Sequence, residues 1–177
     1  DAPGDAWDVV IATGVLPHLT RPAALFEEAH RLLRPGGTLL VEFRNRTFAL
    51  TTFNEYTRSF FLNVLWADVT NGLLAARAEF FLDLRLLGQL PLEADPAHIG
   101  FTDIPARFHR RAEVEHMATT AGFVPVGTHW YHYHAAPPAL RDADPVGYDA
   151  ASLAMEDPDD WRGEYLASAG VLEARKP

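Results

Sequence analysis

Two short apolar runs near the start of the chain flank a segment in which apolar residues recur at helical spacing. Residues 9–12 and 38–43 each suit a strand that is buried on both faces. Between them, Pro22 favours the first turn of a helix. The apolar face of this helix is formed by Leu25, Phe26, Ala29, Leu32 and Leu33. With Arg34-Pro35-Gly36-Gly37 as the expected helix stop, the pattern predicts a βαβ unit of a parallel sheet.

From residue 48 to residue 90 the pattern changes to aromatic and aliphatic stripes at helical spacing. A break at Asn71-Gly72 separates two stripes, which are Phe53, Tyr56, Phe60 and Val64, followed by Leu74, Ala78, Phe81 and Leu84. Proline, glycine and aspartate residues predict a loop over 91–105. We therefore expect a helical insertion over residues 48–105 that covers the substrate as a lid.

The last third of the chain predicts one helix and two strands. The helix has an apolar face and ends at Gly122, and residues 123–133 and 166–173 read as strands. The apolar face consists of Val114, Met117, Ala118 and Ala121. The connection over 135–163 is rich in proline and aspartate and contains no convincing crossover helix. The two strands are therefore expected to pair antiparallel.

The composition is that of one globular domain, with 48% hydrophobic and 22% charged residues among 177. We divide it into a βαβ core (1–47), the helical insertion (48–105) and a C-terminal helix with the final strands (106–177). A net charge of −9 disfavours nucleic acids and anionic membranes, and no apolar run is long enough to cross a membrane. The absence of cysteine excludes disulfides, thiolate zinc sites and a cysteine nucleophile, and it suits the cytoplasm. We expect a small-molecule partner; the oligomeric state is not indicated.

The sequence motifs DVVIATGVLPHL (8–19) and LLRPGGTLLVEF (32–43) resemble the second half of the class I S-adenosylmethionine-dependent methyltransferases. The predicted elements follow that family from its fourth strand onward. The resemblance implies an α/β fold: a partial Rossmann-like sheet with a helical insertion and a C-terminal antiparallel strand pair. The family's glycine-rich cofactor loop and ribose-binding acidic residue belong to its first half, and Gly36-Gly37 precedes its strand and cannot replace that loop. We expect the C-terminal part of a longer enzyme, with half of its S-adenosylmethionine site.

The resemblance implies methyl transfer from S-adenosylmethionine to a small molecule, at oxygen, nitrogen or carbon. In the family, the loop after the fourth strand contacts the cofactor through its backbone, which carries over to Ala12, Thr13 and Gly14. The carboxyl ends of parallel strands meet at one edge of the sheet, so residues 12–18 and Arg44-Asn45 are expected to face one crevice. His18 is the candidate catalytic residue, as a base or an orienting group, because imidazole titrates near neutral pH. The alternative is that His18 only hydrogen-bonds within the loop or caps the helix.

Several other polar residues are candidate substrate contacts. They are Arg44, Asn45, Asn54, Tyr56, His132 and His134. The segments 44–48 and 53–57 also resemble bacterial small-molecule methyltransferases. Structural alternatives exist for each group, because Tyr56 also fits a core stripe, arginines often pair with carboxylates, and the histidines also suit strand packing. No metal site is expected, and the aspartates within 157–160 read as a surface turn.

Two other functions remain open at this point. A nucleotide-dependent oxidoreductase has a similar sheet but ends in a parallel strand. A non-catalytic remnant of the domain would instead use its helical insertion for binding or dimerisation.

Overall fold

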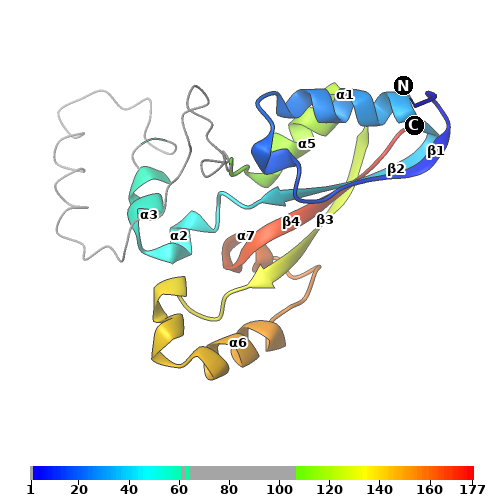
Figure 1. Cartoon of the computed structure of the whole chain (residues 1–177). Coiled ribbons are helices and arrows are strands. Elements are labelled where there is room, and N and C mark those ends of the chain that lie inside the picture. The colour runs from blue at the N-terminus through cyan, green and yellow to red at the C-terminus, as the bar shows by residue number, and fades with distance from the viewer. Residues whose placement is uncertain (1, 61–62, 64–106) are drawn as a thin grey trace.

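The computed structural model describes residues 2–60, 63 and 107–177, and these residues form a four-stranded mixed sheet flanked by helices (Figure 1). The strand order is β1-β2-β4-β3. The strands are β1 (Trp7–Ala12), β2 (Leu33–Arg44), β3 (Val124–Tyr133) and β4 (Ala167–Arg175). The last strand in the sequence therefore lies inside the sheet.

The pairing directions confirm the predicted topology. β1 and β2 are parallel, and α1 (Pro22–Leu32) connects them as a crossover helix. β4 is antiparallel to both of its neighbours, β2 and β3. The βαβ unit and the final antiparallel pair are thus present as the sequence predicts.

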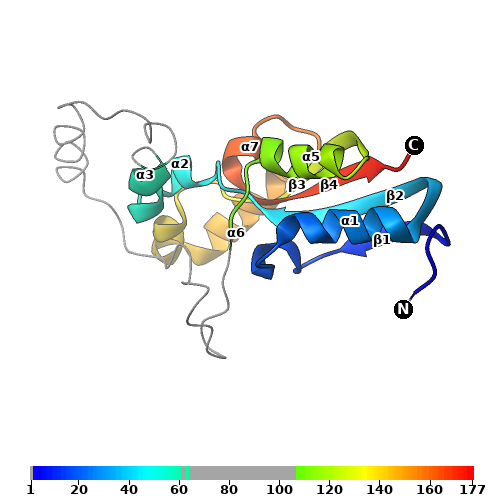
Figure 2. The same ribbon diagram turned by 90° about the horizontal axis from the view of Figure 1, so that it is seen from above.

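The core lies between the sheet and two helices on one of its faces, α1 and α5 (Arg111–Thr120) (Figure 2). Alternate residues of β2 point to this face because side chains alternate along a strand. The fully buried side chains include Phe26 of α1, Val114 of α5 and Leu39, Val41 and Phe43 of β2. Burying each such side chain stabilises the fold by about 1.5–3 kcal/mol.

The edge strand β1 carries a row of apolar side chains that the described residues leave uncovered. Trp7, Val9 and Ile11 are 49%, 48% and 64% exposed. They alternate with Val10 and Ala12, which pack toward the core. The outer edge of β1 has no partner strand among the described residues.

The predicted end of α1 is wrong. The helix ends at Leu32, and Leu33 already has extended backbone and pairs with Trp7. Arg34 directly precedes Pro35, and a proline disfavours helical backbone in the residue before it. The glycines of this segment then form the start of β2, where Gly36 has φ +80°.

The connection between β3 and β4 also differs from the irregular segment that the sequence predicts. It contains a 3-10 turn, η3 (Pro138–Ala143), and the helices α6 (Pro145–Ala154) and α7 (Gly163–Leu166). Asp144 caps α6 by accepting from the Gly147 N–H, and Pro145 occupies its first turn. The Asp-Pro pair is therefore a helix start, although it reads equally as a turn in the sequence.

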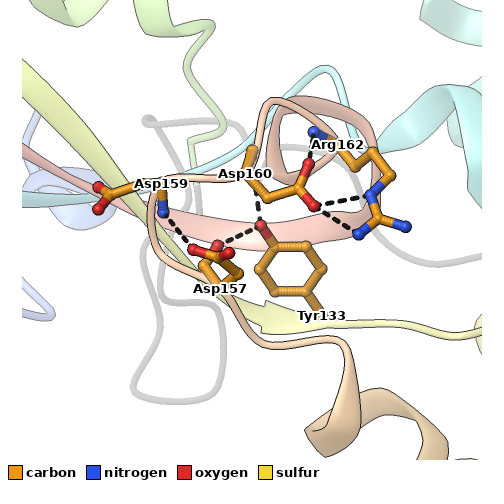
Figure 3. Close-up of polar contacts among 5 residues, drawn as sticks. All are labelled: Tyr133, Asp157, Asp159, Asp160 and Arg162. Atoms are coloured by element: carbon orange, nitrogen blue, oxygen red, sulfur yellow. Dashed lines mark hydrogen bonds and ion pairs between the residues drawn. The ribbon is translucent and has the colours of Figure 1, made fainter.

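The aspartates within 157–160 form the expected surface turn (Figure 3). The Tyr133 hydroxyl donates to the Asp157 carbonyl at 2.6 Å, and Asp160 pairs with the Arg162 guanidinium. The Asp159 N–H donates to the Asp157 carboxylate. The described residues contain no group of histidine or acidic side chains that could hold a metal ion.

Only the first part of the predicted helical insertion is described. Residues 49–60 form two short helices, α2 (Ala49–Thr52) and α3 (Glu55–Phe60). Phe53 lies between them with φ +51° and is exposed, so it does not share a buried stripe with Tyr56 and Phe60. Val64, the second predicted stripe and the loop over 91–105 lie outside the described residues. In the described parts of the chain, no helix has the length and apolar character needed to cross a membrane.

Candidate functional site

The loop that follows β1 is tied to the carboxyl end of β2. The Gly14 N–H donates to the Glu42 carboxylate at 2.8 Å. Burial and a hydrogen bond to the same carboxylate raise the pKa of Tyr131 on β3. Glu42, on the inner strand β2, therefore holds the loop in position. It was missed in the sequence, although an acidic residue in an otherwise apolar strand is a usable signal.

Gly14 gives this loop an open backbone surface. Its φ is +66°, and a Cβ atom placed on it would have no heavy atom within 4 Å. Thr13 and Gly14 are exposed, whereas Ala12 is buried. A ligand can therefore approach the backbone at Thr13 and Gly14 closely, as glycine in a left-handed conformation allows.

A short segment, residues 107–109, joins the loop to the end of β2. The Arg107 N–H donates to the Pro17 carbonyl, and the His109 N–H donates to the Arg44 carbonyl, both at 2.8 Å. Pro17 and His18 belong to the 3-10 turn η1 (Leu16–His18), in which His18 is half-buried. The structure thus brings His18 and Arg44 to the same edge of the sheet.

Arg44 and Tyr56 meet around a phenylalanine of the same segment. The Arg44 guanidinium carbon lies 6.0 Å from the centre of the Phe108 ring, a distance typical of a cation–π contact. The centres of the Phe108 and Tyr56 rings are 5.6 Å apart. Burial raises the pKa of the Tyr56 hydroxyl, and the nearby positive charge of Arg44 opposes that rise. No sequence pattern identifies Phe108, because its contacts are with distant residues.

The two candidate asparagines hold backbone groups of the protein itself. Asn45 is 1% exposed, and its amide nitrogen donates to the carbonyls of Glu164 and Ala167 at 2.8 and 2.9 Å. Its side-chain oxygen accepts from the Thr47 N–H. The Asn54 side-chain oxygen accepts from the Tyr56 N–H at the start of α3. These contacts give both residues a structural role, and substrate contact at either one stays a prediction.

His132 and His134 lie at the end of β3, where the strand alternation breaks because His132 has φ +57°. Both line an open pocket of about 420 Å³, together with Arg141, Tyr148, Asp149, Ser152, Glu156 and other residues of α6 and β4. The His134 ring lies 4.6 Å from the Phe48 ring, and its Nδ1 is 2.8 Å from the Tyr148 hydroxyl. Burial lowers the pKa of His134, and the charge of His132 adds to this effect.

The two groups of candidate residues lie at the same end of the sheet, where β2 and β3 end and β4 begins. Ala169 of β4 pairs with Arg44 on one side and with Tyr131 on the other, and Ala167 pairs with Tyr133. The pocket at the end of β3 therefore lies at the same end of the sheet as Arg44, two strands further along. Sequence reasoning did not find Tyr148, because α6 itself was not predicted.

The lowered pKa of His134 predicts a pH dependence of stability. An unfolded histidine takes up a proton near pH 6.5, whereas half-buried His134 resists protonation. The unfolded state therefore binds more protons as the pH falls, and His134 reduces the free energy of unfolding below about pH 7 by at most about 1.4 kcal/mol per pH unit. In urea unfolding between pH 7 and pH 5, His134→Phe is expected to reduce this slope. The same replacement of exposed His116 on α5 is the control, and equal slopes in both variants would contradict the assignment.

Comparison with known proteins gives one family match, which covers the start of the chain. The family described as a methyltransferase domain matches residues 2–41. No curated protein matches the sequence. The match includes β1, the loop with Gly14 and His18, α1 and most of β2.

The solved structures that align with this chain include methyltransferases at low sequence identity. An S-adenosylmethionine-dependent methyltransferase from Mesorhizobium loti is 12% identical with a TM-score of 0.49, over 99% of this chain and 64% of that one. A possible histamine N-methyltransferase from Thermotoga maritima is 14% identical with a TM-score of 0.48, over 99% and 59%. This chain thus spans about three fifths of the length of these proteins.

The family match covers residues 2–41, which include most of the two sequence motifs that resemble the methyltransferases. The parallel β1–β2 pair and the antiparallel β4 complete a partial Rossmann-like sheet around that segment. Residues 2–41 are therefore similar to a methyltransferase domain, and this match agrees with the resemblance to the class I S-adenosylmethionine-dependent methyltransferases found in the sequence.

Proposed function

We propose that this chain is the C-terminal part of an enzyme that transfers a methyl group from S-adenosylmethionine to a small molecule. One observation carries the proposal. Inside the family-matched segment, the loop with Gly14 and His18 is held beside Arg44 and Tyr56 by the Glu42 carboxylate and residues 107–109. Ligands of open α/β sheets bind beyond the carboxyl ends of the parallel strands, where these residues lie.

The loop after β1 fits a cofactor that is bound through backbone groups. Thr13 and Gly14 are exposed, and the space beside Gly14 is open. Since Glu42 already accepts from the Gly14 N–H, the loop keeps its shape before any ligand arrives. When bound, S-adenosylmethionine supplies an activated methyl group on its sulfur. Ala12, Thr13 and Gly14 would hold one side of it.

Arg44, Tyr56 and His18, at the carboxyl end of the sheet, suit the binding of an acceptor molecule. Methyl transfer needs the attacking atom to lie in line with the methyl group and the departing sulfur, so positioning provides much of the rate. Arg44 and Tyr56 offer a positive charge and a hydroxyl for orienting the acceptor. His18 is the proposed proton acceptor for an acceptor hydroxyl or amine. The antiparallel direction of β4 disfavours the oxidoreductase alternative.

The exposed edge of β1 supports the proposal that a longer enzyme exists. Trp7, Val9 and Ile11 present apolar surface on a strand whose outer edge is unpaired in the described structure. Proteins usually cover such edges and patches, because they otherwise promote association. A further strand and a helical layer would cover both features.

We expect this chain alone to bind S-adenosylmethionine very weakly, with no saturation below about 1 mM in calorimetry. The reason is that only the contacts of Ala12, Thr13 and Gly14 are available on it. A version extended upstream through a glycine-rich loop and an acidic ribose-binding residue should bind in the micromolar range and transfer labelled methyl groups to small acceptors. Micromolar binding by the chain alone would contradict the assigned position of the cofactor. An extended version without binding or transfer would overturn the proposed function.

Two glycine variants of the extended enzyme locate the cofactor. Gly14→Ala is expected to weaken binding about tenfold, because alanine in a left-handed conformation costs roughly 1–2 kcal/mol and the loop relaxes. Gly127→Ala is the matched control, since it also has open space around its Cβ position but no positive φ. Equal affinities of the two variants would argue against cofactor contact at Gly14.

A further inference from the structure

The hydrogen bonds around Tyr148 determine where the protons lie in the pocket at the end of β3. The Tyr148 hydroxyl is 2.9 Å from the Ala136 carbonyl and 2.8 Å from Nδ1 of His134. A carbonyl oxygen only accepts, so the single hydroxyl proton is donated to Ala136. Nδ1 of His134 must then donate to the Tyr148 oxygen. A neutral imidazole has one N–H, and Nε2 therefore carries the lone pair.

The surroundings keep His134 neutral and its ring fixed. Burial disfavours the imidazolium form, and the Phe48 ring at 4.6 Å packs against the imidazole. No polar group of the described residues pairs with Nε2. The charged residues of the pocket are otherwise occupied: Arg141 pairs with Asp149, and Glu156 accepts from the His132 N–H. The pocket thus offers the Nε2 lone pair of His134 as an acceptor on a ring that is held in place.

We propose that this pocket binds a neutral small molecule through a hydroxyl group that donates a hydrogen bond to Nε2 of His134. A neutral ligand is favoured over an anion because Arg141 is already paired with Asp149 and the Glu156 carboxylate adds a negative charge to the pocket. Leu153, on the pocket wall and 71% exposed, provides apolar surface for the body of the ligand. Tyr148 is a positioning residue, since it sets the tautomer of His134. This inference goes beyond the proposed function, because the pocket lies two strands away from Arg44 and its ligand is assigned from the hydrogen bonds of the pocket itself.

The tautomer and the binding are both measurable by nitrogen NMR on the chain labelled with ¹⁵N-histidine. At pH 7.5, Nδ1 of His134 should be protonated and Nε2 unprotonated. Phenol is the probe, and anisole, which has the same ring without a donor, is the matched control. Phenol should shift the Nε2 resonance to a saturating value in the millimolar range, and anisole should leave it in place. Equal effects of phenol and anisole, or a protonated Nε2, would overturn the proposal.

Three variants separate the proposal from a merely structural role. His134→Phe preserves a ring beside Phe48 and should weaken phenol binding about tenfold, the effect of one hydrogen bond. Tyr148→Phe should retain the fold but mix the two tautomers, which lowers phenol affinity and moves both nitrogen resonances. His116→Phe, at an exposed site on α5, should change neither. Unchanged phenol binding in both pocket variants would disprove the assignment.

The outcome is distinguishable from that of the proposed function. If the extended enzyme transfers methyl groups but phenol does not bind at His134, only the pocket inference fails. If phenol binds at His134 while the extended enzyme neither binds nor uses S-adenosylmethionine, the pocket stands and the proposed methyl transfer fails.

Discussion

Replacing His18 with alanine in the extended enzyme is expected to lower the rate of methyl transfer about a hundredfold or more. The affinity for S-adenosylmethionine should change little, because residues 12–14 reach the cofactor through backbone that the substitution leaves in place. His18 lies in η1, which follows that loop directly and is joined through residues 107–109 to Arg44. An imidazole there is near the expected position of the acceptor. As a proton acceptor, it also makes the rate depend on pH, and the variant should lose that dependence.

The measurement combines turnover, cofactor affinity and melting temperature on one preparation. If His18 only packs within η1, His18→Ala should cost roughly 1 kcal/mol of stability and leave turnover near normal. His116→Ala is the matched control, since His116 is exposed on α5, away from the proposed site. Normal turnover with an unchanged pH profile in His18→Ala would remove His18 from the catalytic mechanism.

Asn45→Asp is expected to destabilise the chain by about 3 kcal/mol or more. The side-chain nitrogen that donates to Glu164 and Ala167 is replaced by an oxygen that faces the same two carbonyls. The shape is unchanged, but two hydrogen bonds become repulsive contacts at a site that is only 1% exposed. These bonds hold the start of β4 to the end of β2, so their loss weakens the centre of the sheet.

Asn54→Asp provides the matched control for that substitution. The Thr52 hydroxyl and the Tyr56 N–H both donate to the side-chain oxygen of Asn54, and an aspartate oxygen can accept these two hydrogen bonds equally well. Its negative charge also lies at the start of α3, where helices favour anions. Urea unfolding should therefore show a change within about 1 kcal/mol for Asn54→Asp. Similar losses in both variants would contradict the assigned hydrogen-bond directions.

The sequence predicts the sheet better than it predicts the connections. Apolar runs are enough to predict β1 and β2, because a buried strand depends on local pattern. The antiparallel direction of β4 was predicted correctly although its premise was wrong, because the connection between β3 and β4 contains the helix α6. The start of α6 at Asp144 is missed, since an Asp-Pro pair before a mixed segment indicates a turn as well as a helix. The end of α1 is misplaced because the glycines after Pro35 join a strand.

The candidate site was predictable only where a general rule connects distant residues. The rule that parallel strands present their carboxyl ends at one edge correctly predicts that residues 12–18 and Arg44 come together. No such rule identifies Phe108, which contacts both Arg44 and Tyr56. The role of Asn45 is equally hidden, because the carbonyls that it binds lie more than a hundred residues away in the sequence.

The position of β4 between β2 and β3 has a consequence for synthesis of the protein. β3 leaves the ribosome before the strand that pairs with it, so its hydrogen-bonding groups stay unpaired until residues 167–175 emerge. Pairings between segments far apart in sequence form slowly, and unpaired strands are prone to aggregate in that interval. Pairing of β3 therefore waits until β4 has been synthesised, and β3 stays accessible to chaperones in that interval.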